Sequence, residues 1–107
     1  MPDWRELRVA GLGPIDRVVA IFQVGPPLKR VPFPSFKVKV VERANGSFLA
    51  VLNLRPLGPD GHPDAEAGLG DTVEEALEDA LRRFARIIDE RKLNSEADFA
   101  WADPEEF

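Results

Sequence analysis

Residues 71–92 read DTVEEALEDALRRFARIIDERK and carry the clearest apolar pattern in the chain. Large apolar residues recur at intervals of three and four, with alanines between them: Val73, Leu77, Leu81, Phe84, Ile87 and Ile88. This spacing predicts an amphipathic helix that buries one side. Full burial of each such side chain stabilises a fold by about 1.5–3 kcal/mol. The helix therefore needs an apolar surface to pack on, and we expect that surface to be a sheet.

Both ends of this segment carry residues that suit helix termini. Asp71 and Thr72 are good N-caps, and Thr72 with Glu75 reads as a capping box in which Glu75 reaches back to the amide of the cap residue. Acidic residues gather in the first turns and basic residues follow later, which complements the helix dipole at both ends.

Two apolar segments joined by Asn45-Gly46 predict a β-hairpin. Residues 36–40, FKVKV, alternate apolar and basic residues, which is typical of a strand with one buried face. Asn-Gly tolerates the positive φ angles of a type I′ turn. One face of the next strand is apolar: Phe48, Ala50, Leu52 and Leu54. Leu49 and Val51 lie on the opposite face of this strand. Three segments remain candidates for covering that face: the connection of the first strand, the tail, and a second subunit.

The segments around the hairpin predict one more strand and several irregular connections. Residues 17–25 include a β-branched run, typical of a strand that is buried on both faces or central in a sheet. Four prolines within residues 26–34 forbid regular pairing there. Residues 55–70 hold three prolines and four glycines and predict a long loop, whose last two glycines allow a tight turn into the helix cap. Residues 1–14 predict a short helix or strand before a turn.

These segments together predict an α+β fold: a small antiparallel sheet of three to four strands with one long amphipathic helix packed on it. A chain of 107 residues is long enough for one core. We expect a single domain at residues 1–94, with its core at 17–92, and an acidic aromatic tail at 95–107. The absence of cysteine excludes disulfides and thiol chemistry, and with the short apolar runs it favours a cytoplasmic protein.

Charge is distributed unevenly along the chain. Residues 1–50 hold eight Lys or Arg and four Asp or Glu, whereas residues 51–107 hold six and fifteen. The overall negative charge argues against general nucleic-acid binding, which depends on neutralising phosphates. It suits a basic protein partner. The simpler alternative, that the acidic residues only solvate the surface, stays open.

Few residues predict chemistry. His62 is the only histidine, so a catalytic triad or a histidine metal cluster would have to use it, and its place in the long loop indicates a solvated residue. The acidic residues of that loop do not match the calcium-binding pattern, and the glycine pairs supply only part of a phosphate or dinucleotide signature. We therefore expect no enzyme activity, no metal and no cofactor.

The tail combines aromatic and acidic residues without any Lys or Arg after Lys92. Its rings either dock on the chain's own sheet, which we favour, or contact a partner. The candidate partner-binding residues are Glu96, Asp98, Phe99, Trp101, Glu105, Glu106 and Phe107.

Three segments in this order resemble the HicB-like antitoxin family: FKVKV at 36–40, NGSFLAV at 45–51 and GLGDTVEEALEDA at 68–80. The likeness covers residues 36–92. It implies a partial ribonuclease-H-like core in a protein that neutralises a small basic ribonuclease toxin by covering its active surface. The segment after the second hairpin strand departs from the family, and no DNA-binding segment follows Lys92.

We therefore expect a non-enzymatic protein-interaction module, a homodimer that binds a basic protein through its acidic helix face and tail, with a small toxin-like ribonuclease as one candidate for that partner. One alternative is a small-ligand or nucleic-acid binder. That alternative would use the long loop and four basic residues: Lys29, Arg30, Lys37 and Lys39. The other alternative is a structural homo-oligomer.

Overall fold

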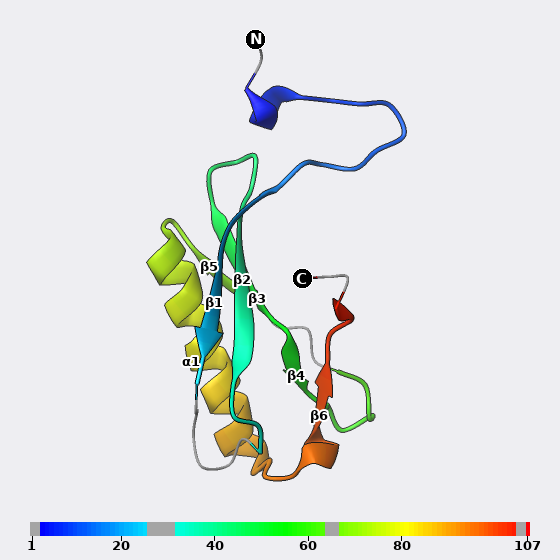
Figure 1. The fold of residues 1–107 in the computed structure, drawn as a ribbon, viewed down its shortest axis with the longest axis vertical. Helices are drawn as coiled ribbons and strands as arrows, with labels where there is room; N and C mark the ends of the chain where they lie inside the picture. Colours follow the sequence, from blue (N-terminus) through cyan, green and yellow to red (C-terminus); the bar gives the residue numbers. More distant parts are fainter. Residues whose placement is uncertain (1–2, 26–31, 64–66, 105–106) are drawn as a thin grey trace.

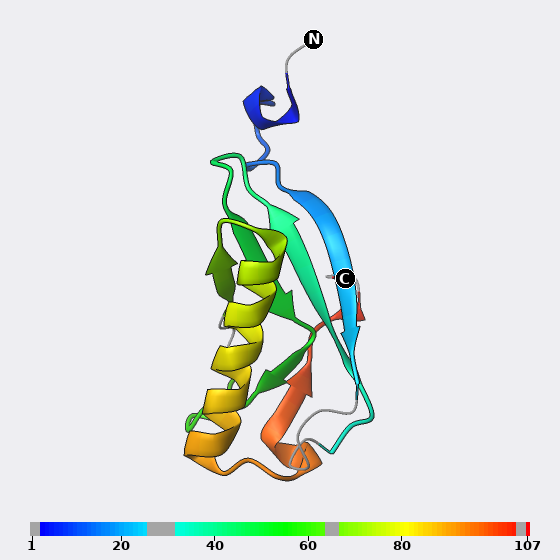
Figure 2. The ribbon, with the colours of Figure 1, turned by 90° about the vertical axis from the view of Figure 1, so that its left-hand side faces the viewer.

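One long helix lies across one face of a four-stranded antiparallel sheet (Figures 1 and 2). The computed structural model describes residues 3–25, 32–63, 67–104 and 107. The main sheet has the order β1-β2-β3-β5, and β4 and β6 form a second, two-stranded sheet. The elements are η1 (Trp4–Glu6), β1 (Arg17–Val24), β2 (Phe36–Glu42), β3 (Phe48–Leu52), β4 (Leu54–Pro56), β5 (Gly68–Gly70), α1 (Val73–Arg91), η2 (Glu96–Asp98) and β6 (Phe99–Trp101). The predicted α+β class is confirmed.

Helix α1 begins and ends where its sequence predicts. The Thr72 hydroxyl accepts a hydrogen bond from the Glu75 amide at 3.1 Å. The Glu75 carboxylate accepts from the Asp71 amide at 2.9 Å, one residue before the amide that we expected. At the other end Lys92 adopts a left-handed conformation, with φ 54°. Of the helices in the described part of the chain, none combines the length and hydrophobicity that a membrane span requires.

The predicted hairpin is present, with the expected register and a different turn. Val38 pairs with Leu52 and Val40 with Ala50, so the apolar residues of both strands face α1. The Gly46 amide bonds to the Arg43 carbonyl at 2.9 Å, and Gly46 has φ 88°. Asn45 does not adopt a positive φ, so the expected type I′ turn is wrong. A three-residue loop that ends in a left-handed glycine forms instead.

Two further predictions are corrected. The strand at 17–24 is not central, because β1 pairs with β2 alone and forms one edge of the sheet, with half of its residues exposed. The predicted loop at 55–70 holds part of β4, all of β5 and an isolated bridge between Leu57 and Pro63. Both short strands lack the length that produces a periodic signal in the sequence.

The core lies between α1 and the two sheets. Phe36 packs against Phe84 with ring centroids 5.0 Å apart, and both side chains are buried. The tail contributes to the same core, because β6 pairs with β4 and Phe99 is only 7% exposed. Residues 95–104 therefore belong to the folded domain and not to a separate tail.

Helix α1 approaches the backbone of β5 closely. A Cβ placed on Gly68 would lie 2.3 Å from the carbonyl oxygen of Ala76 and from the amide nitrogen of Ala80. A Cβ on Gly70 would lie 2.5 Å from the Cβ of Glu75. These glycines therefore allow helix and strand to pack backbone against backbone, whereas we had assigned them to a turn.

We predict that Gly68→Ala lowers the free energy of unfolding by about 3 kcal/mol or more, because α1 must move away from β5 to admit a methyl group. Urea denaturation measures the change. Gly13→Ala is the matched control, since its Cβ would meet no atom within 4 Å, and it should stay within about 1 kcal/mol of the parent. Equal stability of the two variants would contradict the close packing.

Candidate functional site

Among the residues that the structure describes, no α-helix lies over the face of the main sheet that points away from α1. The strand register defines this open face as two rows across the sheet. One row is Val18, Val41, Leu49 and Leu69, and the other is Ile21, Lys39 and Val51. Gln23 and Lys37 follow at the far end. The first row of the open face contains only apolar side chains. The polar side chains of the face follow in the second row and beyond it, toward one end of the sheet.

The open face is unusually apolar for a solvent-facing surface. Val18 is 53% exposed, Ile21 is 49% exposed and Leu69 is 51% exposed. A β-bulge between Val18 and Ala20 brings Val18 and Ile21 to the same face although they are three residues apart. Val18 and Ile21 lie on β1 and Leu69 lies on β5, so the exposed side chains are at the two edges of this face, whereas Val41 between them is only 9% exposed. Exposed apolar side chains that lie close together on a protein surface mark an interaction surface.

An N-terminal arm, residues 7–16, adds to this apolar surface. Its exposed large side chains are Leu7 (42%), Val9 (56%), Leu12 (74%) and Ile15 (38%). Among the described residues eight large hydrophobic side chains are exposed, and seven of them lie on the arm or on the open face; the eighth is Trp101. In Figure 1 α1 lies to the left of the sheet, and the arm projects beyond the upper end of the sheet to the right. The open face and the arm therefore point to the same side of the molecule.

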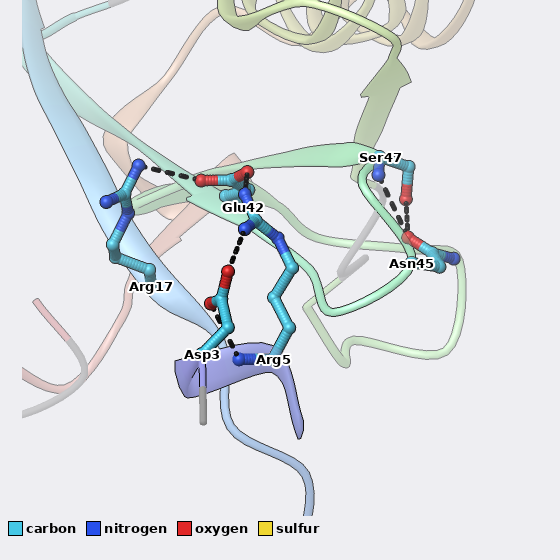
Figure 3. A network of polar contacts seen from close by, with 6 residues as sticks. All are labelled: Asp3, Arg5, Arg17, Glu42, Asn45 and Ser47. Carbon is cyan, nitrogen blue, oxygen red and sulfur yellow. Dashed lines mark hydrogen bonds and ion pairs between the residues drawn. The ribbon is translucent and has the colours of Figure 1, made fainter. Parts of the chain in front are cut away.

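One carboxylate binds residues at both ends of the arm (Figure 3). Glu42, which is 7% exposed, accepts from the guanidinium of Arg5 and from that of Arg17, the latter at 2.8 Å. Both guanidinium groups also lie near the ring of Trp4, at 4.9 Å for Arg5 and 5.8 Å for Arg17. Arg5 precedes the arm and Arg17 follows it, so Glu42 closes the base of the arm. The hydrogen bond from Arg5 is the main cause of the lowered pKa of Glu42, and Arg17 adds to it.

The structure separates the three aromatic rings of the tail. Phe99 lies in the core, with its ring centroid 6.1 Å from that of Phe33 and 6.3 Å from that of Phe84. Because its side chain is buried, a partner cannot contact it. Trp101 packs on Phe33 at 5.0 Å and stays 49% exposed. The ring of Phe107 lies 4.7 Å from the ammonium of Lys39, on the open face. The tail thus docks on its own domain.

The acidic candidates of the tail also differ from one another. Asp98 accepts from the amides of Asn94 at 3.0 Å and Ser95 at 3.1 Å, and these bonds lower its pKa. It therefore caps η2, whereas Glu96 is exposed. Glu105 and Glu106 lie outside the described residues.

Exposed carboxylates lie at both ends of α1, with Asp89 and Glu90 near its C-terminus and a larger group at its N-terminus. Four carboxylates there are exposed: Asp71, Glu74, Glu75 and Glu78. Further along, Glu78 pairs with Arg82, and Asp79 accepts from Arg83 at 3.0 Å. The expected acidic helix face is therefore two groups of carboxylates, with Arg82 and Arg83 between them.

The remaining candidates do not form a common site. His62 is exposed, and its amide donates to Asp60 at 3.0 Å. Within the residues that the structure describes, no three His, Cys, Asp or Glu side chains are grouped as metal ligands would be. Lys29 and Arg30 lie outside the described residues, and Lys39 faces Phe107.

A scan of protein-family models, a search of curated protein sequences and a search of solved structures found no match to this chain. The resemblance to HicB-like antitoxins therefore stays a prediction from three short motifs.

Sequence reasoning missed two parts of the candidate surface. It treated the apolar residues of 17–24 as buried, and it gave no role to the arm. The arm had one signal, since residues 9–15 contain no charged residue in a chain that is 31% charged. Nothing in the sequence indicated that Glu42 would bind both Arg5 and Arg17.

We predict that the base of the arm opens in acid. Because the folded state lowers the pKa of Glu42, the ion pairs are fully present above the ordinary glutamate value of about 4.3 and are lost as the pH falls through the lower folded value. Fluorescence of Trp4 in a Trp101→Phe background should therefore stay constant from about pH 7 to 5 and shift to longer wavelength below about pH 4.

Far-UV circular dichroism at each pH separates opening of the arm from global unfolding. Glu42→Gln should show the shifted Trp4 spectrum already at neutral pH, and the control Glu6→Gln should behave as the parent. A normal Trp4 spectrum in Glu42→Gln would show that this carboxylate does not hold the arm.

Proposed function

We propose that this chain is a non-enzymatic protein-interaction module of the cytoplasm, and that its binding surface is the open face of the main sheet. The observation that carries the proposal is the concentration of exposed apolar side chains on this face and on the adjoining arm. Water contact with such side chains costs about 25 cal/mol per Å² of apolar area, and association with a partner removes that cost.

The shape of the surface supports binding of a protein segment. The first row of the open face is wholly apolar, and its exposed side chains, Val18 and Leu69, lie on the two edge strands, where a segment of another protein can contact them. Lys37 and Gln23 at the far end supply polar groups that can orient the bound segment.

A second candidate is capture of a basic protein, as the HicB-like resemblance implies. The exposed carboxylates at the start of α1 favour it, and next to them Arg82 pairs with Glu78 and Arg83 with Asp79. In the tail, Glu96, Trp101 and Phe107 could add contacts with that partner, whereas Phe99 and Asp98 have roles within the fold. Salt would weaken a complex of this kind.

We predict that the double variant Ile21→Glu/Leu69→Lys lowers the amount of protein that co-purifies with the tagged chain at least about tenfold. The substitutions place charges in the contact, and a tenfold loss of affinity requires a change of only about 1.4 kcal/mol in binding free energy. The two substitutions leave the net charge of the chain unchanged. Both positions are about half exposed, so the fold should persist, and circular dichroism checks this.

Glu74→Gln/Glu78→Gln is the matched comparison on the other surface. Binding that survives this change and is lost in Ile21→Glu/Leu69→Lys supports the open face. The reverse result supports capture of a basic partner, and binding that survives both changes would contradict both candidates.

A further inference from the structure

The tail returns to the open face after β6 ends. The amide of Ala102 donates to the carbonyl of Asn53 at 2.7 Å, and Ala102 is buried, so the tail is anchored directly after this strand. Further along, the amide of Phe107 donates to the carbonyl of Pro104 at 3.2 Å. The centre of the Phe107 ring lies 4.7 Å from the ammonium of Lys39. The chain's own tail therefore shows one kind of side chain that the open face accepts.

The contact with Phe107 lies in the second row of the open face. Lys39 has Ile21 of β1 on one side and Val51 of β3 on the other. The ammonium attracts the face of an aromatic ring, and the neighbouring aliphatic side chains offer apolar contact to the same ring. Lys39 and Val51 are half-buried, whereas Ile21 is 49% exposed. Apolar surface thus remains at this site beside the ring that occupies it.

The charges of this site and of the tail are complementary. Strand β2 contributes two positive charges to the open face, because Lys37 and Lys39 are two residues apart and point to the same side. Residues 103–107 contain three acidic residues and no basic one. The site therefore favours an aromatic residue whose neighbours in the sequence are acidic.

We propose that the part of the open face around Lys39 recognises an aromatic side chain in an acidic segment of a partner protein, and that Phe107 is a competitor that occupies the same site in the free chain. This inference rests on the proposed function, because it names the chemistry of the partner for the same surface. The site holds one ring over one ammonium, so the segment of the partner must displace Phe107 before it binds there.

Release of Phe107 costs little. Its side chain and that of Lys39 are both partly exposed, and a cation–π contact at such a site favours the docked tail only about fivefold. The bond between Ala102 and Asn53 lies before the residue that is released, so β6 and the buried Phe99 keep their places. The tail should therefore raise the dissociation constant of the partner's segment roughly fivefold without preventing binding.

A nuclear magnetic resonance titration tests the proposal with the sequence of the tail as the probe. The probe is a peptide of residues 102–107, ADPEEF, blocked at both ends. We expect it to shift the amide signals of Ile21, Lys39 and Val51 in the full-length Phe107→Ala chain, with a dissociation constant on the order of 1 mM, since a short tether supplies an effective concentration of that size. The parent chain should bind the peptide roughly fivefold more weakly, because its own ring competes.

Two controls separate the ring and the ammonium from charge alone. A peptide with alanine in place of the phenylalanine should bind at least about fivefold more weakly to the Phe107→Ala chain. Lys39→Gln in the same chain should weaken binding of ADPEEF by a similar factor. Arg43→Gln is the matched variant, since it removes one positive charge from an exposed position of the same hairpin, and it should leave the affinity within about twofold of the Phe107→Ala chain.

Absence of shifts at Ile21, Lys39 and Val51 would overturn the inference, as would equal affinity for the peptide that lacks the ring. Equal affinity of the parent and Phe107→Ala chains would show that Phe107 is not a competitor. If the peptide does not bind while Ile21→Glu/Leu69→Lys still loses its co-purified protein, only the chemistry assigned to the partner is wrong and the proposed function stands.

Discussion

The seat of α1 on β5 is the contact on which the rest of the structure depends. Gly68 removes the side chain that would otherwise separate the two backbones, and Ala76 and Ala80 keep the facing side of the helix small. A hydrogen bond fixes the same contact from the helix side, since Asp79 accepts from the amide of Leu69 at 2.9 Å. That bond is the main cause of the lowered pKa of Asp79, with Arg83 as a second cause. Two independent features thus position α1 on the edge strand β5: the absence of a side chain at Gly68 and the hydrogen bond accepted by the Asp79 carboxylate.

This seat explains why the sheet is covered unevenly. The helix packs mainly against β5 and β3, and β1 lies at the opposite edge. A single helix can cover only one face of a sheet, so the other face depends on whatever the chain or a partner places there. The chain places Phe107 near Lys39 at one part of it, and in the row from Val18 to Leu69 it buries Val41 and leaves Val18 and Leu69 about half exposed at the two edges. The half-exposed apolar side chains at the two edges of this face are therefore a consequence of an architecture with a single long helix.

The sequence predicted those parts of the fold that repeat over several residues. The spacing of three and four gave α1, and strict alternation in β2 and β3 gave the register that places Val38 and Val40 under the helix. The pattern failed where no period exists. A β-branched run does not distinguish an edge strand from a central one, and the bulge after Val18 breaks the period of two that would assign faces. The tail was ambiguous for a related reason, because a three-residue strand such as β6 has no periodic signal. In addition, an aromatic residue such as Phe99 is equally common in a core and in an interface, so its identity alone does not decide between them.

The pairing of Glu42 with two arginines helps to explain how an apolar arm can stay extended in water. A flexible segment with four large exposed apolar residues would gain free energy by collapsing onto any apolar surface, including the open face of its own chain. Arg5 and Arg17, which flank the arm, both donate charge-assisted hydrogen bonds to Glu42, which is only 7% exposed, so a movement that pulls either arginine away breaks such a bond. A buried carboxylate that loses its cations is costly, so the ion pairs oppose collapse more strongly than exposed pairs could. The bonds to Glu42 therefore fix the two ends of the arm, whose large apolar side chains stay between 38% and 74% exposed.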